Sequence, residues 1–268
     1  MKRILLICLI VFVLVIVAAV IVGVVLGSVL NRVAVTSSGA NFNYDDAKSY
    51  KVGDVEISSK VYKITANWLN GKVKVSQYSG DTLSIKDEVE EGTLKEELKL
   101  RWKKDGDEVI IQYAEAGKKL DLDNLKKNLV ILVPSSWTLD EIDIEVVSAD
   151  SEVALSNIRE LEWQSVNGYL DVNCDYLSSI DGNTVNGDVT IYVGKKGPEK
   201  LSFESVNSNI TISLPSDSSF TLKRNSINGS LDSEFSGRIK GDDIFIVGNG
   251  DYVWNIESVN GDVKILEI

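Results

Sequence analysis

The chain has 268 residues, of which 44% are hydrophobic, so it can bury a sizeable core and is not disordered throughout. Its 28 Lys and Arg residues face 40 Asp and Glu residues, and the net charge of −12 argues against nucleic acid as a partner. Histidine is absent, which removes the usual general base and the Ser-His-Asp arrangement, so we expect no catalytic, cofactor-binding or metal site.

The N-terminal segment is expected to anchor the chain in a membrane. Residues 4–30 carry no charge, and as a helix they would span about 40 Å against a hydrocarbon core of about 30 Å. A secretory signal peptide has a shorter apolar region, so we favour an uncleaved anchor over cleavage near residues 38–40. Lys2 and Arg3 make residues 1–3 a cytoplasmic stub by the positive-inside rule. We therefore expect a single-pass protein of the cell membrane, with the lipid bilayer around residues 4–30 and the rest of the chain outside.

The segment after the anchor leads into the main domain. Residues 31–44 are small and polar without clear periodicity, and we expect a tether there. The β domain is expected at residues 45–268. Its first hundred or so residues contain runs such as EVIIQYA and NLVILV, separated by Gly, Asp and Lys, which predict short strands. With Lys2 and Arg3 set apart, 26 basic residues remain against 40 acidic ones, a net charge of −14.

A repeated S-V-N-G unit makes residues 146–268 the most regular part of the chain. Successive asparagines of the repeat at 186, 207, 228 and 249 are each 21 residues apart. Aliphatic residues alternate with polar ones on both sides of each asparagine, which is the period of half-buried strands. The expected structural repeat turns are Asn167, Gly168, Asn186, Gly187, Asn207, Asn228, Gly229, Asn249, Gly250, Asn260 and Gly261.

Two all-β architectures fit this repeat. In a β-solenoid or β-helix-like domain, each repeat is one coil of about 21 residues, and equivalent strands stack in parallel about 4.8 Å apart. The asparagines can then hydrogen-bond along the stack. In a stack of antiparallel β-hairpins, each Asn-Gly is a tight turn and Phe203 pairs with Ile212. The constant period favours the solenoid, because stacked coils need equal circumference whereas hairpins tolerate variable loops.

Some side chains could take part in metal binding, sugar binding or thiol chemistry, and each also has a structural explanation. Acidic residues recur near the expected turns, and calcium prefers several such oxygen ligands, with the pair Asp242-Asp243 as the first place to look. The calcium-binding nonapeptide G-G-x-G-x-D is absent, so we favour solvated turn residues. The alternation places Trp163 and Trp254 inward, in the core rather than stacked on a sugar. Cys174 is expected to be a small buried hydrophobe.

A family resemblance rests on three motifs. The recurrent S-V-N-G-D-V-x-I, the V-P-S-S-W at 133–137 and the closing G-N-G-D-Y-V-W-N-I-E-S-V-N-G-D-V-K-I together resemble the DUF4097 family over roughly residues 50–268. Members are β-strand-repeat envelope proteins, frequent in Gram-positive bacteria, that carry a provisional adhesin label. The resemblance implies an extracytoplasmic β-repeat fold, often behind a membrane segment, and an association with the cell envelope and its stress responses. It brings no catalytic residues.

The leading hypothesis is a non-enzymatic, membrane-tethered β-repeat module that displays a long acidic surface. We expect its partner to be an envelope protein, a cationic peptide or a cell-wall polymer, held more weakly as salt rises. The alternatives are a carbohydrate-active enzyme on a β-helix and a purely structural spacer or sensor domain. Two converging carboxylates in a cleft with exposed tryptophans would favour the enzyme.

Overall fold

The computed structural model describes residues 33–36, 39–89, 94–120, 125–241 and 243–268, and this part of the chain is all-β. Its strands are accompanied by two short 3₁₀ turns, η1 (Ala47–Ser49) and η2 (Glu96–Leu98). In these ranges no helix has the length and apolar character needed to cross a membrane. The expected stub at 1–3 and anchor at 4–30 lie outside the described residues, so both stay predictions.

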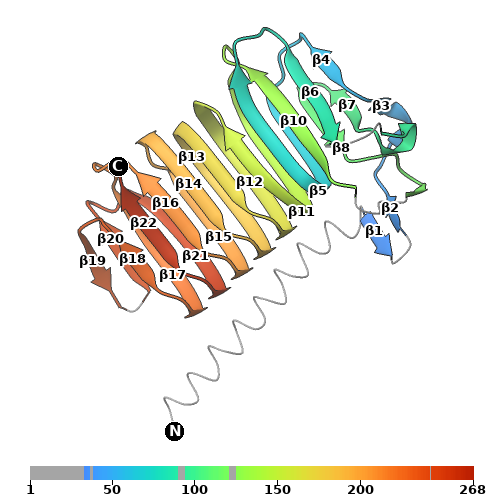
Figure 1. The fold of residues 1–268 in the computed structure, drawn as a ribbon. Coiled ribbons are helices and arrows are strands. Elements are labelled where there is room, and N and C mark those ends of the chain that lie inside the picture. The colour runs from blue at the N-terminus through green and yellow to red at the C-terminus, as the bar shows by residue number, and fades with distance from the viewer. Residues whose placement is uncertain (1–32, 37–38, 90–93, 121–124, 242) are drawn as a thin grey trace.

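The N-terminal part of the domain is a mixed sheet that forms one end of the molecule (Figure 1). Runs that were expected to be strands, such as EVIIQYA and NLVILV, do form strands here. The strands are β3 (Lys51–Val52), β4 (Val55–Ile57), β5 (Lys63–Tyr78), β6 (Leu83–Val89), β7 (Arg101–Asp105), β8 (Glu108–Gln112) and β10 (Lys127–Pro134). Strand β10 pairs antiparallel with β6 and parallel with β5. Strand β5 also pairs in parallel with β11 (Leu139–Ala154), so this sheet continues into the parallel strands that follow.

The segment expected to be a tether contains a β-hairpin. Strand β1 (Val33–Thr36) pairs with β2 (Gly39–Phe42), and β2 pairs with β9 (Lys119–Leu120). The side chain of Phe42 is buried, and its ring stacks on that of Tyr113 at a centroid distance of 5.4 Å. This apolar contact holds the segment against the domain, so the folded part begins before residue 45.

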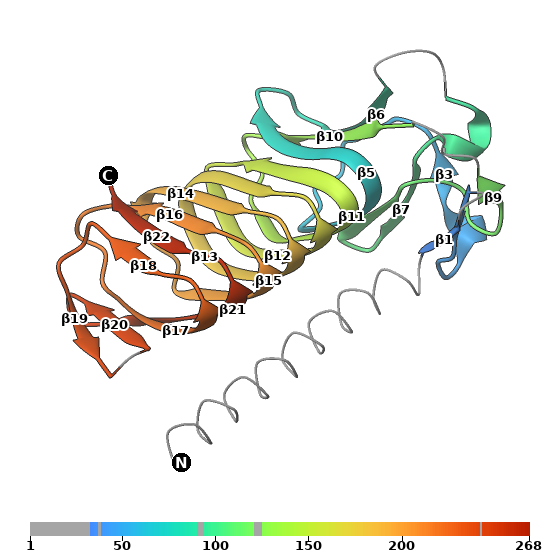
Figure 2. The same cartoon turned by 60° about the horizontal axis from the view of Figure 1, so that its bottom comes forward.

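A stack of parallel strands runs from the mixed sheet to the other end of the molecule (Figures 1 and 2). The long strands β5, β11 and β13 are shared between two faces, because one half of each pairs with one set of strands and the other half with a different set. The strands of the stack after β5 are β11 (Leu139–Ala154), β12 (Asn157–Asn167), β13 (Leu170–Asn186), β14 (Val189–Lys196), β15 (Lys200–Asn207), β16 (Ile210–Leu214), β17 (Phe220–Asn228), β18 (Leu231–Ser233), β21 (Tyr252–Asn260) and β22 (Val263–Glu267).

The pairing in this stack brings equivalent residues of different repeats together. Phe203 of β15 pairs in parallel with Gly182 of β13 and with Ile256 of β21, and not with Ile212. The alternative of antiparallel hairpins at each Asn-Gly is therefore wrong for these strands. In parallel pairing, equivalent positions of neighbouring strands lie side by side about 4.8 Å apart. The same residue type therefore fits the same position in each strand of the stack.

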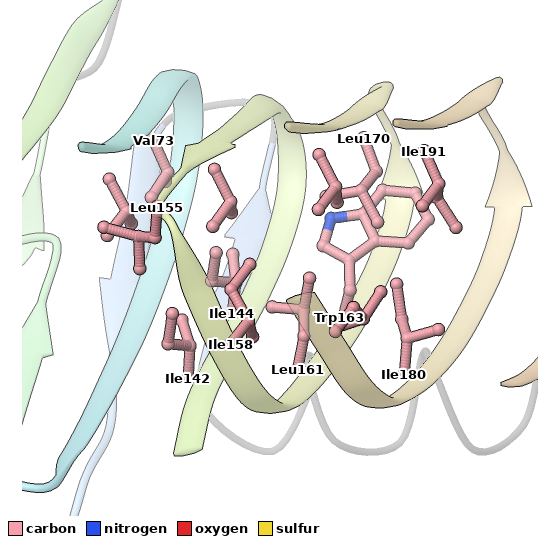
Figure 3. Close-up of a cluster of buried hydrophobic side chains, with 14 of the residues drawn as sticks. Val73, Ile142, Ile144, Leu155, Ile158, Leu161, Trp163, Leu170, Ile180 and Ile191 are labelled. Atoms are coloured by element: carbon pink, nitrogen blue, oxygen red, sulfur yellow. The ribbon is translucent and has the colours of Figure 1, made fainter. Parts of the chain in front are cut away.

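The core fills the inside of the stack (Figure 3). Alternate residues point inward, and aliphatic side chains such as Ile144 and Ile180 are fully buried. Full burial of one such side chain stabilises the fold by about 1.5–3 kcal/mol, which explains the repeat without a ligand. Trp163 and Trp254 are buried as the alternation predicts. Cys174 is buried too, and burial raises the pKa of its thiol to about 12, so the thiol is not a nucleophile at neutral pH.

Five asparagines of the repeat form one ladder along the stack. The side-chain amide of each of four members donates a hydrogen bond to the side-chain oxygen of the member before it, at 2.7–3.0 Å. The order in space is Asn167, Asn186, Asn207, Asn260 and Asn228. The glycines that follow four of them have positive φ, namely Gly168, Gly187, Gly229 and Gly261.

The C-terminal strands lie inside the stack and not at its end. Strand β21 pairs with β15 on one side and with β17 on the other, and β22 lies between β16 and β18 in the same way. Two further strands extend the sheet: β20 (Ile244–Val247) pairs antiparallel with β17, and β19 (Gly237–Lys240) pairs antiparallel with β20. Chain order and spatial order therefore differ for the last repeats.

Asn249 and Gly250 lie in the turn between β20 and β21, outside the ladder where they were expected. The hydroxyl oxygen of Ser219 accepts hydrogen bonds from the backbone N–H groups of Asn249, Gly250 and Asp251, at 3.1, 3.1 and 3.3 Å. The turn carries the chain past the beginning of β17, from one side of that strand to the other. The 21-residue spacing between Asn228 and Asn249 therefore does not mark a coil.

A buried ion pair lies in the N-terminal part. Nζ of Lys127 is 3.1 Å from Oδ2 of Asp87, and it also donates hydrogen bonds to the carbonyl oxygens of Leu98 and Tyr113. The lysine side chain is 0% exposed, and its Nζ lies 4.6 Å from the ring centroid of Trp68. Burial lowers the pKa of Lys127 to about 8, because removal from water disfavours the charged form.

Candidate binding surface

One outward side of the stack carries a dense set of carboxylates, which we call the acidic face. It is formed by β12, β15 and β21, together with the halves of β11 and β13 that pair with them. On these strands the inward residues are apolar, so the residues between them point to solvent. The outward carboxylates are Glu141, Asp143, Glu145, Glu160, Glu162, Asp181, Glu204 and Glu257.

The parallel register aligns these carboxylates in rows. Asp143, Glu162 and Asp181 are register partners on three adjacent strands. Because neighbouring strands are about 4.8 Å apart, like charges in one row repel each other. Burial raises the pKa of Glu162, and the neighbouring carboxylates of Glu141 and Glu160 raise it further. The fold therefore concentrates negative charge that a cationic partner would relieve.

A second pair of carboxylates extends the acidic face toward the C-terminal strands. Glu204 and Glu257 are register partners on β15 and β21. Burial raises the pKa of Glu204, and the carboxylate of Glu257 adds to the effect. In the described part of the chain, no hydrogen bond or ion pair engages the side chains of Glu160, Glu162, Glu204 or Glu257. These four groups are available to a partner.

Carboxylates on the other face of the stack serve the fold instead. Oδ1 of Asp188 accepts a hydrogen bond from the backbone N–H of Asn209 at 2.9 Å, and Oδ1 of Asp262 accepts one from that of Ser230 at 2.6 Å. The hydrogen bonds from Ser230 lower the pKa of Asp262. The pKa of Glu162 is raised, whereas that of Asp262 is lowered. The direction of the pKa shift therefore distinguishes Asp262, whose carboxylate accepts hydrogen bonds within the fold, from Glu162, whose carboxylate accepts none from the described residues.

Metal binding finds no support among the described residues. In those ranges no group of three or more His, Cys, Asp or Glu side chains is placed to hold an ion. The carboxylate of Asp262, one of the expected turn acids, is engaged by Ser230 as described above. Asp242 lies outside the described residues, so calcium binding at the Asp242-Asp243 pair stays untested.

A polar hollow of about 550 Å³ lies at the N-terminal end of the acidic face. Its lining includes Thr65, Asn67 and Gln112, which are buried although their side chains are polar. Nζ of Lys63, also in the lining, is 2.5 Å from Oε1 of Glu141. This ion pair neutralises one carboxylate and marks the place where the acidic face ends.

The acidic face and the repeat turns are different parts of the molecule. Four of the five ladder asparagines are exposed and Asn260 is half-buried, but their side-chain amides hydrogen-bond one another, so they hold the stack together. The sequence signal for the acidic face was the run of acidic residues at polar positions between apolar ones, as in Glu160 and Glu162. The sequence did not reveal which of these positions share a face, because that depends on the register.

Comparison with known proteins gives a fold likeness and no family. No family model matches the sequence, and no curated protein matches it, so the resemblance to DUF4097 stays a prediction. A solved structure from Clostridium sporogenes, provisionally described as a cell adhesion protein, matches with a TM-score of 0.50 at 18% identity, over 82% of this chain and 100% of that chain. A provisionally described adhesin from Bacteroides fragilis matches over 82% of this chain and 98% of its own, at 11% identity and a TM-score of 0.34. At these identities the likeness concerns the fold alone.

Proposed function

We propose that this protein is a membrane-anchored, extracytoplasmic and non-enzymatic binding module whose acidic face holds a cationic envelope partner. In this proposal the parallel stack is a β-solenoid with coils of about 21 residues. The observation that carries the proposal is the row of aligned carboxylates at Asp143, Glu162 and Asp181, in which neighbouring charges of the same sign repel one another. The provisional description of the Clostridium sporogenes structure as a cell adhesion protein agrees with a binding role.

The spacing of the acidic face indicates the kind of partner. Carboxylates repeat about 4.8 Å apart across the strands and about 6.6 Å apart along them, which are the two spacings of any β-sheet. An extended peptide or polymer with repeated ammonium or guanidinium groups can follow such a row and pair with several carboxylates at once. Each exposed pair contributes little, so affinity arises from many pairs and falls as salt rises.

Removing three charges from the acidic face should weaken binding of a lysine decapeptide. We expect the triple variant Glu160→Gln, Glu162→Gln and Asp181→Asn to bind this peptide about tenfold more weakly or worse, with a shallower salt dependence. Binding would be measured by calorimetry with the full chain in discs of neutral phosphatidylcholine, over a series of salt concentrations. The triple variant should fold at least as stably as the wild type, because it removes like-charge repulsion.

The matched control removes three charges elsewhere. Asp171, Asp217 and Asp251 are exposed residues outside the acidic face, and their conversion to asparagine changes the net charge by the same amount. This control should keep nearly full affinity for the peptide. Equal losses in the two triple variants would show that only net charge matters, and binding that is indifferent to salt would reject the proposal.

The proposed location has its own test. An apolar segment at 4–30 that follows Lys2 and Arg3 supports a β domain outside the membrane. Protease added to intact spheroplasts should then remove the β domain and leave a short membrane-bound fragment. A cytoplasmic marker protein must stay intact in the same sample. Full protection of the β domain until the cells are lysed would place it inside.

A further inference from the structure

A second hollow, of about 420 Å³, is lined by residues of β17, β18, β19 and β20. These strands lie together at the C-terminal end of the stack (Figure 2). The volume of the hollow lies in the range of small-molecule sites. Phe235 and Phe245 are buried in its wall, whereas Ile239 is 75% exposed. Its apolar lining consists of Leu222, Leu231, Phe235, Ile239, Ile244 and Phe245.

An arginine occupies a core row at this end. Arg224 of β17 is the register partner of Ile256, which in turn pairs with Phe203, and both of these side chains are buried. The inward alternation of β17 runs through the buried Phe220 and Leu222 to Arg224. The last strand of this row therefore replaces an apolar core residue by a cation that lines the hollow.

One nitrogen of the Arg224 guanidinium group lacks a hydrogen-bond partner. This nitrogen, Nη1, is buried and makes no hydrogen bond, and the described residues form no ion pair with it. The charge of Arg224 acts on Asp262 only at longer range, where it helps to lower the pKa of that carboxyl. An arginine that only covered the end of the core with its aliphatic stem would keep its nitrogens in water. A buried donor without an acceptor is unfavourable, whereas an anionic group in the hollow would give it a charge-assisted hydrogen bond.

The polar lining limits the charge of the ligand. Asp232 and Asp243 also line the hollow and are exposed. Their carboxylates would repel a dianion more strongly than a monoanion. We propose that this hollow binds a single-chain amphiphile that carries one carboxylate, with the carboxylate on Arg224 and the apolar chain against Phe235 and Phe245. The site is separate from the acidic face and does not depend on the proposed function.

Octanoate is the probe for this site, with octanol as its uncharged counterpart and acetate as its head group alone. We expect the full chain in discs of neutral phosphatidylcholine to bind octanoate saturably, and octanol and acetate about tenfold more weakly or worse. Binding would be measured by calorimetry against empty discs, which corrects for partition into the lipid. Equal binding of octanoate and octanol would overturn the proposal, because Arg224 would then play no part.

Variants separate ligand binding from folding. Arg224→Met keeps an apolar side chain of similar length, and we expect it to bind octanoate about tenfold more weakly or worse. Lys223→Met removes the same charge from the neighbouring exposed position and should bind as the wild type does. Ile239→Asp tests the hollow without touching a buried residue, and should also abolish binding. The proposal would be rejected if Arg224→Met and Ile239→Asp both bound octanoate with wild-type affinity. It would also be rejected if sedimentation showed a dimer in which a second copy of the chain occupies the hollow.

An amphiphile with one carboxylate can come either from solution or from the membrane bilayer. A second binding experiment distinguishes these two sources. Oleic acid is placed in the discs, and octanoate binding is measured again. Competition by the oleic acid would identify a bilayer source, and unchanged octanoate binding would identify a free one. Either result supports the site only when Arg224→Met removes the binding.

Discussion

Replacing Gly187 by alanine should destabilise the parallel stack by about 3 kcal/mol or more. Gly187 has a φ of +152°, and a Cβ atom built on it would lie 1.7 Å from the carbonyl oxygen of Gly168 on the adjacent strand. The methyl group therefore meets backbone and not a movable side chain, so the two strands must separate. We expect the loss to appear in urea unfolding of the detergent-solubilised full chain, followed by tryptophan fluorescence.

Gly106 provides the matched control for this substitution. Its φ is +56°, but a Cβ atom there would meet nothing within 4 Å. Gly106→Ala should therefore cost only the left-handed backbone strain of about 1 kcal/mol. Ser208 shows how the same column admits a side chain, because it follows Asn207 of the ladder and does not have positive φ. Equal effects of the alanine substitutions at 187 and 106 would contradict the steric argument.

The other large effect is expected at the buried ion pair. Lys127→Met should lower the free energy of unfolding by about 3–5 kcal/mol, because the buried carboxyl group of Asp87 then loses its cation. Adding Asp87→Asn should recover much of the loss, since asparagine can still accept the hydrogen bond from the backbone N–H of Leu100. Arg159→Met breaks an ion pair whose side chains are 70% and 53% exposed, and it should change stability little.

The pH dependence of stability in the wild type and in Lys127→Met tests whether the charge of Lys127 is buried in the folded protein. The pKa of Lys127 is about 8 in the folded protein and 10.5 in its ordinary state, so the unfolded chain binds more protons between these values. The Lys127 contribution to stability should therefore rise from about pH 8 to about pH 10.5. In Lys127→Met this rise should be absent. A wild-type profile that stays parallel to that of the variant across this window would contradict the burial of the charge.

Several features of the fold could be predicted because their causes are local. The period of two placed Trp163 and Trp254 in the core, and it identified the strands. Such a pattern depends only on which side of a strand a residue lies. The hairpin of β1 and β2 escaped prediction, because its short strands are held by Phe42 and Tyr113, which are far apart in the sequence.

The acidic face shows the limit of local reasoning more sharply. Glu160, Glu162 and Asp181 each lie next to an apolar residue that points inward, so alternation puts them at outward positions. Glu160 repels Glu162 along one strand, but the repulsion between Glu162 and Asp181 exists only because the register puts them side by side on adjacent strands. In the same way, Arg224 became a candidate ligand group only when the structure showed β17 at the end of the stack.

The sequence by itself determined an all-β domain, its inward and outward residues and the asparagines that mark its repeats. The tertiary structure alone decided the order of the last strands. The segments around Ser205, Ser226 and Ser258 have nearly the same S-V-N pattern, so β15 could pair with either of the later strands by local criteria. Insertion of β21 between β15 and β17 depends on the turn around Ser219 and on the packing of Trp254 against Phe220, whose ring centroids are 4.1 Å apart. Contacts between distant residues made that choice, and no local pattern contains them.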